Sequence, residues 1–206
     1  MAKVLLINPP FNIAKENYDS SLSVGLLSIA SYLKSLGLEV EIIDGARQND
    51  YLDLIKKKAR EVEWVGISVM TTQIAHALSI SLLIKGINQI CKIVWGGSHP
   101  TFFPKETIEN ELIDVVCVGE GEKTMAELAG GKNLAEIAGI VWKYNNEIIT
   151  NPPRELHEPK EMSLFNWDLA PGEILEKLYL IPSLTSRGCP HRCTFCINAI
   201  LKNRWR

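Results

Sequence analysis

The sequence predicts an α/β fold with a doubly wound, parallel five-stranded sheet, and three observations support this class. Five short apolar runs are rich in Val and Ile, which is typical of strands buried on both faces. Segments with apolar residues at helical spacing separate these runs. The regular alternation of strand and helix predicts right-handed crossovers, with helices on both faces of the sheet.

The elements follow one another in a simple order. We expect strands at residues 3–10, 39–45, 64–70, 92–97 and 114–121. Helices are expected at residues 24–36, 51–62, 74–90, 104–112 and 123–128. Gly37 and Gly45 lie at junctions between elements, where tight turns favour glycine. The expected strand order is 2-1-3-4-5, as in flavodoxin-like sheets.

The pattern changes after residue 131. Asn145 and Asn146 separate two alternating runs, which predicts a β-hairpin. Four prolines between residues 150 and 180 favour a surface linker, broken by one short helix at 172–178. A new strand is expected at 178–186. We therefore divide the chain into a wound domain (1–131), a hairpin and linker (132–177), and a strand with a cysteine-rich loop (178–206).

Composition excludes several classes of protein. The 206 residues carry a formal net charge of −2, so no overall positive field would attract nucleic acid. The N-terminal apolar run is too short for a signal peptide, and no apolar run approaches the length of a membrane span. We therefore expect a cytoplasmic protein with reduced cysteines that binds neither nucleic acid nor membrane.

Loops at the carboxyl ends of the expected strands predict a pocket for a large ligand, because such loops form the ligand crevice of wound sheets. Glycines there allow close approach of a ligand, and hydroxyl groups can bond to it. The alternative is that the glycines and hydroxyls only form turns, and that the carboxylates cap a helix. The first strand lacks the glycine fingerprint of dinucleotide sites, which argues against nicotinamide and flavin dinucleotides. The candidate ligand-binding residues are Pro10, Ser68, Thr71, Gly96, Gly97, His99, Gly119, Glu120 and Gly121.

Three cysteines near the C-terminus predict a metal centre. Cys189, Cys193 and Cys196 have the spacing C-x3-C-x2-C and can turn three thiolates toward one point. Three thiolates leave one iron of a 4Fe-4S cluster open for a ligand. A zinc site with His191 is the main alternative, although structural zinc sites usually draw on two separated ligand pairs. The third cysteine argues against a thioredoxin-like pair.

Two groups of motifs resemble known families. The segment "RGCPHRCTFC" resembles the signature of radical S-adenosylmethionine enzymes. The segments "INPP", "GLLSIASYLKSLG", "VGISVMTT", "VWGGSHPT" and "VVCVGEGEKT" resemble the cobalamin-binding domain of those radical enzymes that also use cobalamin. The resemblance implies a 4Fe-4S cluster whose open iron chelates S-adenosylmethionine, with Phe195 beside the adenine. It also implies an electron donor such as flavodoxin or ferredoxin, and an unknown substrate methylated at an unactivated carbon.

The chain departs from the family pattern in two ways. The loop after the first strand lacks the D-x-H-x-x-G motif, so we expect cobalamin to bind base-off, without a histidine ligand. The family's catalytic βα barrel is represented only by its first strand and cluster loop. We therefore expect a chain truncated after the cluster motif and inactive in isolation. The rival interpretation is a non-catalytic binding module without cobalamin, whose cysteines hold zinc or no metal.

Overall fold

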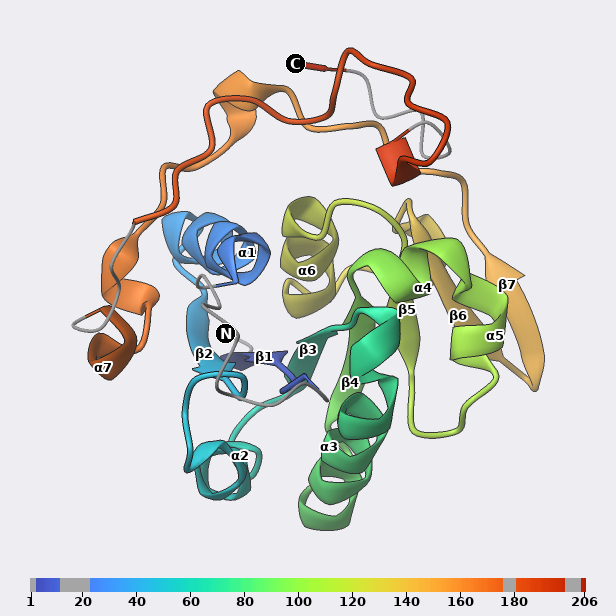
Figure 1. Cartoon of the computed structure of the whole chain (residues 1–206). Coiled ribbons are helices and arrows are strands. Elements are labelled where there is room, and N and C mark those ends of the chain that lie inside the picture. The colour runs from blue at the N-terminus through green and yellow to red at the C-terminus, as the bar shows by residue number, and fades with distance from the viewer. Residues whose placement is uncertain (1–2, 12–22, 176–180, 199–204) are drawn as a thin grey trace.

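The strands form one sheet in the computed structural model, which describes residues 3–11, 23–175, 181–198 and 205–206 (Figure 1). The sheet has seven strands in the order β2-β1-β3-β4-β5-β6-β7. The first five strands are parallel and follow the predicted order 2-1-3-4-5, which confirms the wound fold. Their bounds are β1 (Lys3–Asn8), β2 (Glu39–Asp44), β3 (Trp64–Ser68), β4 (Lys92–Gly96) and β5 (Val115–Cys117).

Helices cover both faces of this sheet, as predicted (Figure 1). On one face, α1 (Val24–Ser35) and α6 (Glu122–Ala129) pack over side chains such as Leu6. On the other face, α2 (Tyr51–Lys58) and α3 (Ile74–Ile87) pack over Leu5 and Ile7. This alternation follows from the opposite directions of successive side chains along a strand. No helix within the described ranges is long and apolar enough to cross a membrane.

Two short helices occupy the region where one was expected. They are α4 (Ser98–Phe102) and α5 (Pro104–Ile108), whereas the sequence predicted a helix at 104–112. The sequence interpretation treated Ser98, His99 and Pro100 as part of the ligand-binding loop after the fourth strand, so it did not include α4. A proline within the first turn is compatible with a helix, since the first backbone N–H groups of a helix lack intrahelical partners.

The predicted hairpin is present, and it also extends the sheet. Strand β6 (Ile140–Tyr144) pairs antiparallel with β5, and β7 (Glu147–Thr150) pairs with β6. Asn145 and Asn146 have φ values of 49° and 65°, as the turn of a two-residue hairpin requires. The sequence interpretation placed the hairpin outside the five-stranded sheet. In the structure it covers the edge of β5, which would otherwise have unpaired backbone groups.

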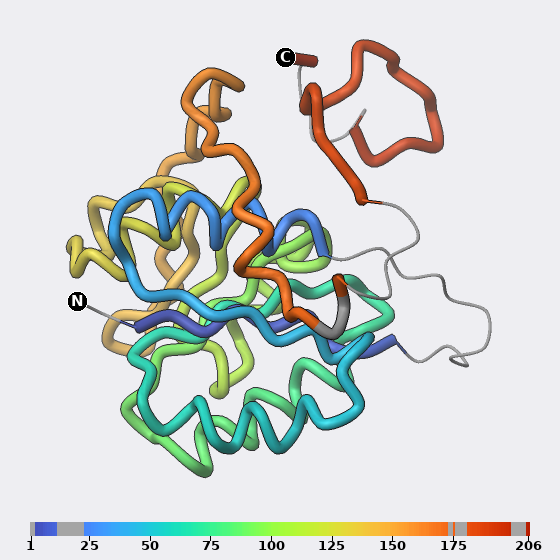
Figure 2. The backbone as a smooth tube through the Cα atoms, turned by 90° about the vertical axis from the view of Figure 1, so that its left-hand side faces the viewer, coloured from blue at the N-terminus to red at the C-terminus, as the bar shows by residue number. Residues whose placement is uncertain are grey.

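The expected linker is a packed segment, which we call the strap (residues 151–170). It crosses above α1 (Figures 1 and 2) and contains two 3-10 turns, Pro159–Glu161 and Trp167–Leu169. Phe165, Trp167 and Leu169 pack against the core on the α1 side of the sheet, and the Asn166 N–H donates to Ser31 Oγ at 2.8 Å. The strap is followed by the short helix α7 (Gly172–Leu175), within the predicted helical region.

A strand was expected at 178–186, and the structure shows none in the part of this range that it describes. Residues 178–180 lie outside the described residues, and residues 181–186 contain no strand. A strand needs a neighbour to satisfy its backbone hydrogen bonds, and no described strand lies beside this segment. The apolar run "LYLIPSL" was therefore insufficient evidence for a strand.

Candidate functional site

A pocket of about 230 Å³ opens at the carboxyl ends of the parallel strands. Its floor contains Leu6, Gly66 and Val94 from three neighbouring strands. Its walls come from α1 and α6, which contribute Leu26 and Met125. The interior is therefore predominantly apolar, and it lies where wound sheets bind their ligands.

Six of the nine predicted ligand-binding residues of the wound domain line this pocket. They lie at or just after the carboxyl ends of β3, β4 and β5, and the parallel sheet brings these strand ends together at one edge. The six are Ser68, Gly96, Gly97, Gly119, Glu120 and Gly121.

The other three predicted residues do not line the pocket. Thr71 Oγ1 lies 3.3 Å from His99 Nδ1, and the His99 ring packs on Phe103 at 5.2 Å between centroids. Burial lowers the pKa of His99, which favours its neutral form. Pro10 lies beside Gly45, where an added Cβ would come 3.1 Å from its Cδ atom. The prediction that these residues contact the same ligand depended on their position in neighbouring loops, and the structure does not bring them to the pocket.

Glycines shape the pocket in two different ways. A Cβ added at Gly66 would lie 2.8 Å from Leu6 Cδ2, so this glycine permits close packing at the floor. Gly97 has a φ of 96°, and a Cβ there would lie 2.8 Å from the Val69 backbone nitrogen. The backbone geometry by itself therefore requires glycine at position 97. Gly25 in α1 differs from both, because a Cβ added there meets no atom within 4 Å.

A buried ion-pair cluster borders the pocket. The Ser28 hydroxyl donates to Glu122 Oε1 at 2.7 Å, and Arg187 Nη2 donates to the same oxygen at 2.6 Å. Burial by itself raises the pKa of Glu122, but the Arg187 and Ser28 partners outweigh it and hold that pKa below its usual range. Glu122 is therefore ionised at neutral pH, and it is also the first residue of α6, where a negative charge is favourable.

Glu120 forms the second carboxylate of this cluster. Arg187 Nη1 lies 3.2 Å from Glu120 Oε1, and the Arg206 guanidinium pairs with the same oxygen. The backbone N–H of His157 donates to Glu120 Oε2 at 3.0 Å. Two carboxylates and two guanidinium groups therefore balance one another at the mouth of the pocket. The alternative interpretation, in which the carboxylates of this loop cap a helix, did not include these partners.

Sequence reasoning missed several pocket residues, and they come from distant parts of the chain. Gly25 and Ile29 belong to α1, while Leu184 and Arg187 belong to the segment before the cysteines. Arg187, two residues before Cys189, was a usable signal, because a charged side chain that becomes buried needs a charged or hydrogen-bonding partner. Nothing in the local pattern identified Glu122 as that partner.

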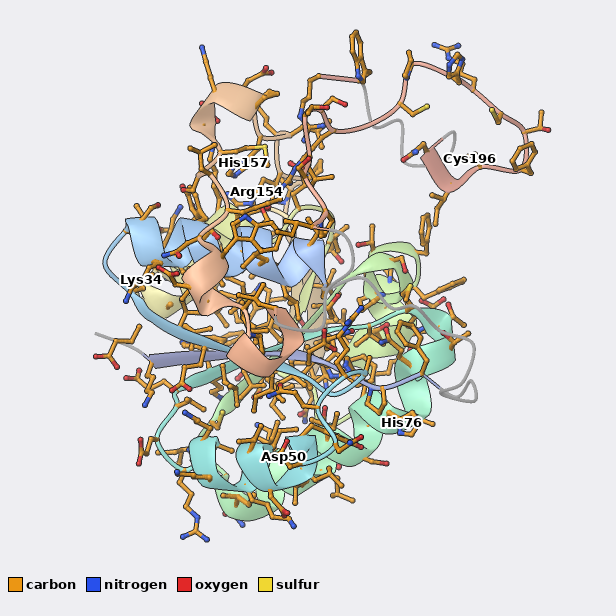
Figure 3. The ribbon with its side chains drawn as sticks, turned by 60° about the vertical axis from the view of Figure 1, so that its left-hand side comes forward. Lys34, Asp50, His76, Arg154, His157 and Cys196 are labelled. Carbon is orange, nitrogen blue, oxygen red and sulfur yellow. The ribbon has the colours of Figure 1, made fainter. Side chains whose placement is uncertain are left out.

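The cysteine loop stands apart from the sheet (Figure 2). Figure 3 shows Cys196 on this outlying loop, away from the helices. The Cys196 N–H donates to the Cys193 carbonyl at 3.0 Å, and Phe195 is 92% exposed. Three thiols are a suitable donor set for an iron-sulfur cluster. Within the described ranges, however, no group of three or more Cys, His, Asp or Glu residues is arranged to hold a metal ion.

The two remaining cysteines, Cys91 and Cys117, are small apolar residues of the core. Cys91 and Cys117 are buried among apolar residues on and beside the strands. Burial raises the pKa of each thiol to about 11, so both are protonated at neutral pH. Neither has the reactive thiolate character of a catalytic cysteine.

Comparison with known proteins connects this architecture to a family. Residues 18–129 match the B12 binding domain. Over 99% of its length, the chain is 34% identical to an uncharacterized methyltransferase of Pyrococcus horikoshii, and it covers 47% of that protein. It is 25% identical to the anaerobic magnesium-protoporphyrin IX monomethyl ester cyclase of a Synechocystis species, over 99% of the chain and 44% of the cyclase. The chain therefore spans about half the length of these curated relatives.

A solved structure has the same fold over nearly the whole chain. It is the cobalamin-dependent S-adenosylmethionine radical enzyme OxsB with aqua-cobalamin bound. The TM-score is 0.79 with 27% identity, covering 95% of this chain and 28% of OxsB. The similarity covers both the wound sheet and much of the C-terminal part of the chain.

Proposed function

Because the chain belongs to the B12-binding domain family, we propose that it is the cobalamin-binding part of a radical S-adenosylmethionine enzyme. The apolar pocket at the carboxyl ends of the strands carries this proposal, since it suits the flat, largely apolar base of a nucleotide tail. Leu6, Leu26, Val94 and Met125 would surround that base, and the hydroxyl of Ser68 lies at the rim. The loop after β1 offers no D-x-H-x-x-G histidine, so the proposed binding mode is base-off without a histidine ligand.

The proposed role of the cysteine loop is to hold a 4Fe-4S cluster. Cys189, Cys193 and Cys196 supply three thiolates, the number that leaves one iron open for S-adenosylmethionine. The loop must close around one point to do so, because the described thiols are not gathered into a metal-ready group. The exposed Phe195 is available to contact the adenine ring.

The proposed reaction is methyl transfer to an unactivated carbon of an unknown substrate. Bound cobalamin would supply the methyl group, while this chain's own residues hold the tail and exclude water from it. The Pyrococcus relative is named as a methyltransferase, as is the cytidylyl-2-hydroxyethylphosphonate methyltransferase of Streptomyces wedmorensis, which is 27% identical over 94% of the chain. Cyclisation is the second candidate reaction, because the Synechocystis relative is a cyclase.

A substitution in α1 tests the tail pocket. Gly25 lines the pocket, and a Cβ there meets no atom within 4 Å, so leucine would enter the pocket without a backbone clash. We expect Gly25→Leu to weaken hydroxocobalamin binding at least tenfold in a titration followed by absorption. Wild-type protein should shift the bound spectrum to the base-off form.

A matched variant controls for the change of residue type. Gly86 in α3 is also exposed with open space around its Cβ, and it does not line the pocket. Leucine favours helix at either position by about 0.8 kcal/mol relative to glycine, so neither variant should unfold. Gly86→Leu should bind as wild type does. Equal affinity in both variants, or no binding to the wild-type chain, would refute a cobalamin tail in this pocket and favour the non-catalytic module.

A further inference from the structure

Arg187 lies between the two proposed cofactor sites. Its side chain lines the pocket of the wound domain, and its backbone lies two residues before Cys189. The residue between them, Gly188, has a φ of 77°, a left-handed turn that redirects the chain into the cysteine loop. The position of Arg187 therefore determines where the cysteine loop begins.

The guanidinium group of Arg187 is held from several sides. It bonds to Glu122 and Ser28 through Nη2, at 2.6 Å and 2.8 Å, and it pairs with Glu120 through Nη1. The side chains of Arg187 and Glu122 are 15% and 6% exposed. Removing the guanidinium would leave the Glu122 carboxylate buried without its charged partner, which is strongly unfavourable. Arg187 and Glu122 therefore form a buried ion pair that holds the arginine side chain in place, rather than a solvated surface contact.

The base of the cysteine loop is closed at the same place. The Arg187 N–H donates to the Arg206 carbonyl at 2.8 Å, and the Arg206 N–H donates to the Arg187 carbonyl at 2.9 Å. The Arg206 side chain also pairs with Glu120, so both ends of the loop are attached to the segment between β5 and α6. That segment forms one wall of the pocket.

We propose that Arg187 is a positioning residue that couples occupancy of the tail pocket to the arrangement of the cysteine loop. This inference rests on the proposed function, since it takes the pocket occupant to be the tail of cobalamin. A ligand that packs against Glu120, Gly121 and Arg187 stabilises the present positions of these groups. It therefore favours the arrangement in which Arg187 stays paired with the two carboxylates and holds the base of the cysteine loop. By linkage, holding the loop must favour the ligand to the same extent.

Alkylation of the loop cysteines measures this coupling in the full chain without iron. We expect hydroxocobalamin to slow iodoacetamide modification of Cys189 at least threefold, as followed by peptide mass spectrometry. Arg187→Met should raise the rate at Cys189 without cobalamin and abolish the slowing by cobalamin. Arg187→Lys, which retains a charge but loses the forked geometry, should give an intermediate result.

Two controls separate coupling from loss of the fold. Arg192→Met removes an exposed arginine from the same loop and should leave both effects unchanged. Cys91 and Cys117 are buried in the core, so their modification reports unfolding of any variant. An Arg187→Met protein with both cysteines protected remains a valid test.

The possible failures are distinguishable. If wild-type protein does not bind cobalamin, the proposed function fails. The alkylation rates of Cys189 without cobalamin still test whether Arg187 holds the cysteine loop in place. Equal ligand-free rates at Cys189 in wild type and Arg187→Met would overturn the positioning role. Binding of cobalamin with the same slowing in both proteins would overturn the coupling while leaving the pocket assignment in place.

Discussion

Replacing Gly97 with alanine should destabilise the protein through a backbone collision rather than through the loss of a ligand contact. Gly97 has φ 96° and ψ −170°, a region that is essentially restricted to glycine. An added Cβ would lie 2.8 Å from the Val69 nitrogen and 2.9 Å from its carbonyl oxygen. These atoms bond to the Gly96 carbonyl at 2.8 Å and to the His99 N–H at 3.0 Å, so they cannot move away freely.

The size of the effect follows from two contributions. The backbone conformation costs a residue with a Cβ about 1–3 kcal/mol. Relief of the collision would break or stretch two backbone hydrogen bonds, at about 1 kcal/mol each. We therefore expect Gly97→Ala to lower the free energy of unfolding by about 3–5 kcal/mol, a large share of the roughly 5–15 kcal/mol typical of a domain.

Gly119 offers a matched comparison on the same pocket rim. Its φ is 88°, but a Cβ there meets no atom within 4 Å, so Gly119→Ala incurs the backbone strain alone, about 1–2 kcal/mol. Urea denaturation followed by tryptophan fluorescence, to which the buried Trp95 contributes, gives both free energies by linear extrapolation. If the two variants lose the same free energy of unfolding, the collision with Val69 does not contribute to the effect at Gly97, and the steric argument fails.

Two further predictions concern His157 and the cysteine loop. His157 is 1% exposed, and neither ring nitrogen has a hydrogen-bond partner in the described structure. Burial and the nearby charge of Lys123 lower its pKa, so protonation favours the unfolded chain, and stability falls as pH drops below the ordinary value of 6.5. His157→Phe should keep the edge contact with Tyr32. Urea denaturation at pH 7.5 and 5.5 gives the loss of unfolding free energy on acidification, and we expect this loss to be smaller in the variant by up to about 1.4 kcal/mol. The same loss in both proteins would contradict the role of His157. Anaerobic reconstitution with iron and sulfide should give a coloured cluster that is lost in the triple alanine variant of Cys189, Cys193 and Cys196, whereas a colourless product with one zinc would support the rival module.

Local sequence pattern was sufficient for most of the wound domain. Apart from α4, the strands and helices were predicted within a few residues, because buried parallel strands and amphipathic helices leave distinct periodicities. The turn at Asn145 and Asn146 was also predictable, since these residues tolerate positive φ. The pairing of the hairpin with β5 was not, because a strand's partner depends on which edge remains open in the assembled sheet.

The same division applies to the pocket. Its rim could be predicted because carboxyl ends of parallel strands meet at one edge, which brings Ser68, Gly97 and Gly121 together whatever the side chains are. Thr71 and His99 lie outside the pocket, in the 3-10 turn Thr71–Gln73 and in α4, and their placement depends on the path of the chain through these two elements. That path depends on packing, which local periodicity does not describe.

By itself, the sequence determined the fold class, the strand order and the C-x3-C-x2-C spacing of Cys189, Cys193 and Cys196. Only the tertiary structure decided how these parts are connected. Ser28 lies 94 residues from Glu122 in the chain and 159 residues from Arg187, yet the three side chains share one buried hydrogen-bonded cluster. Such a cluster forms because an ionised carboxylate can be buried only with charged and hydrogen-bonding partners, and the folded chain is what brings those partners within reach.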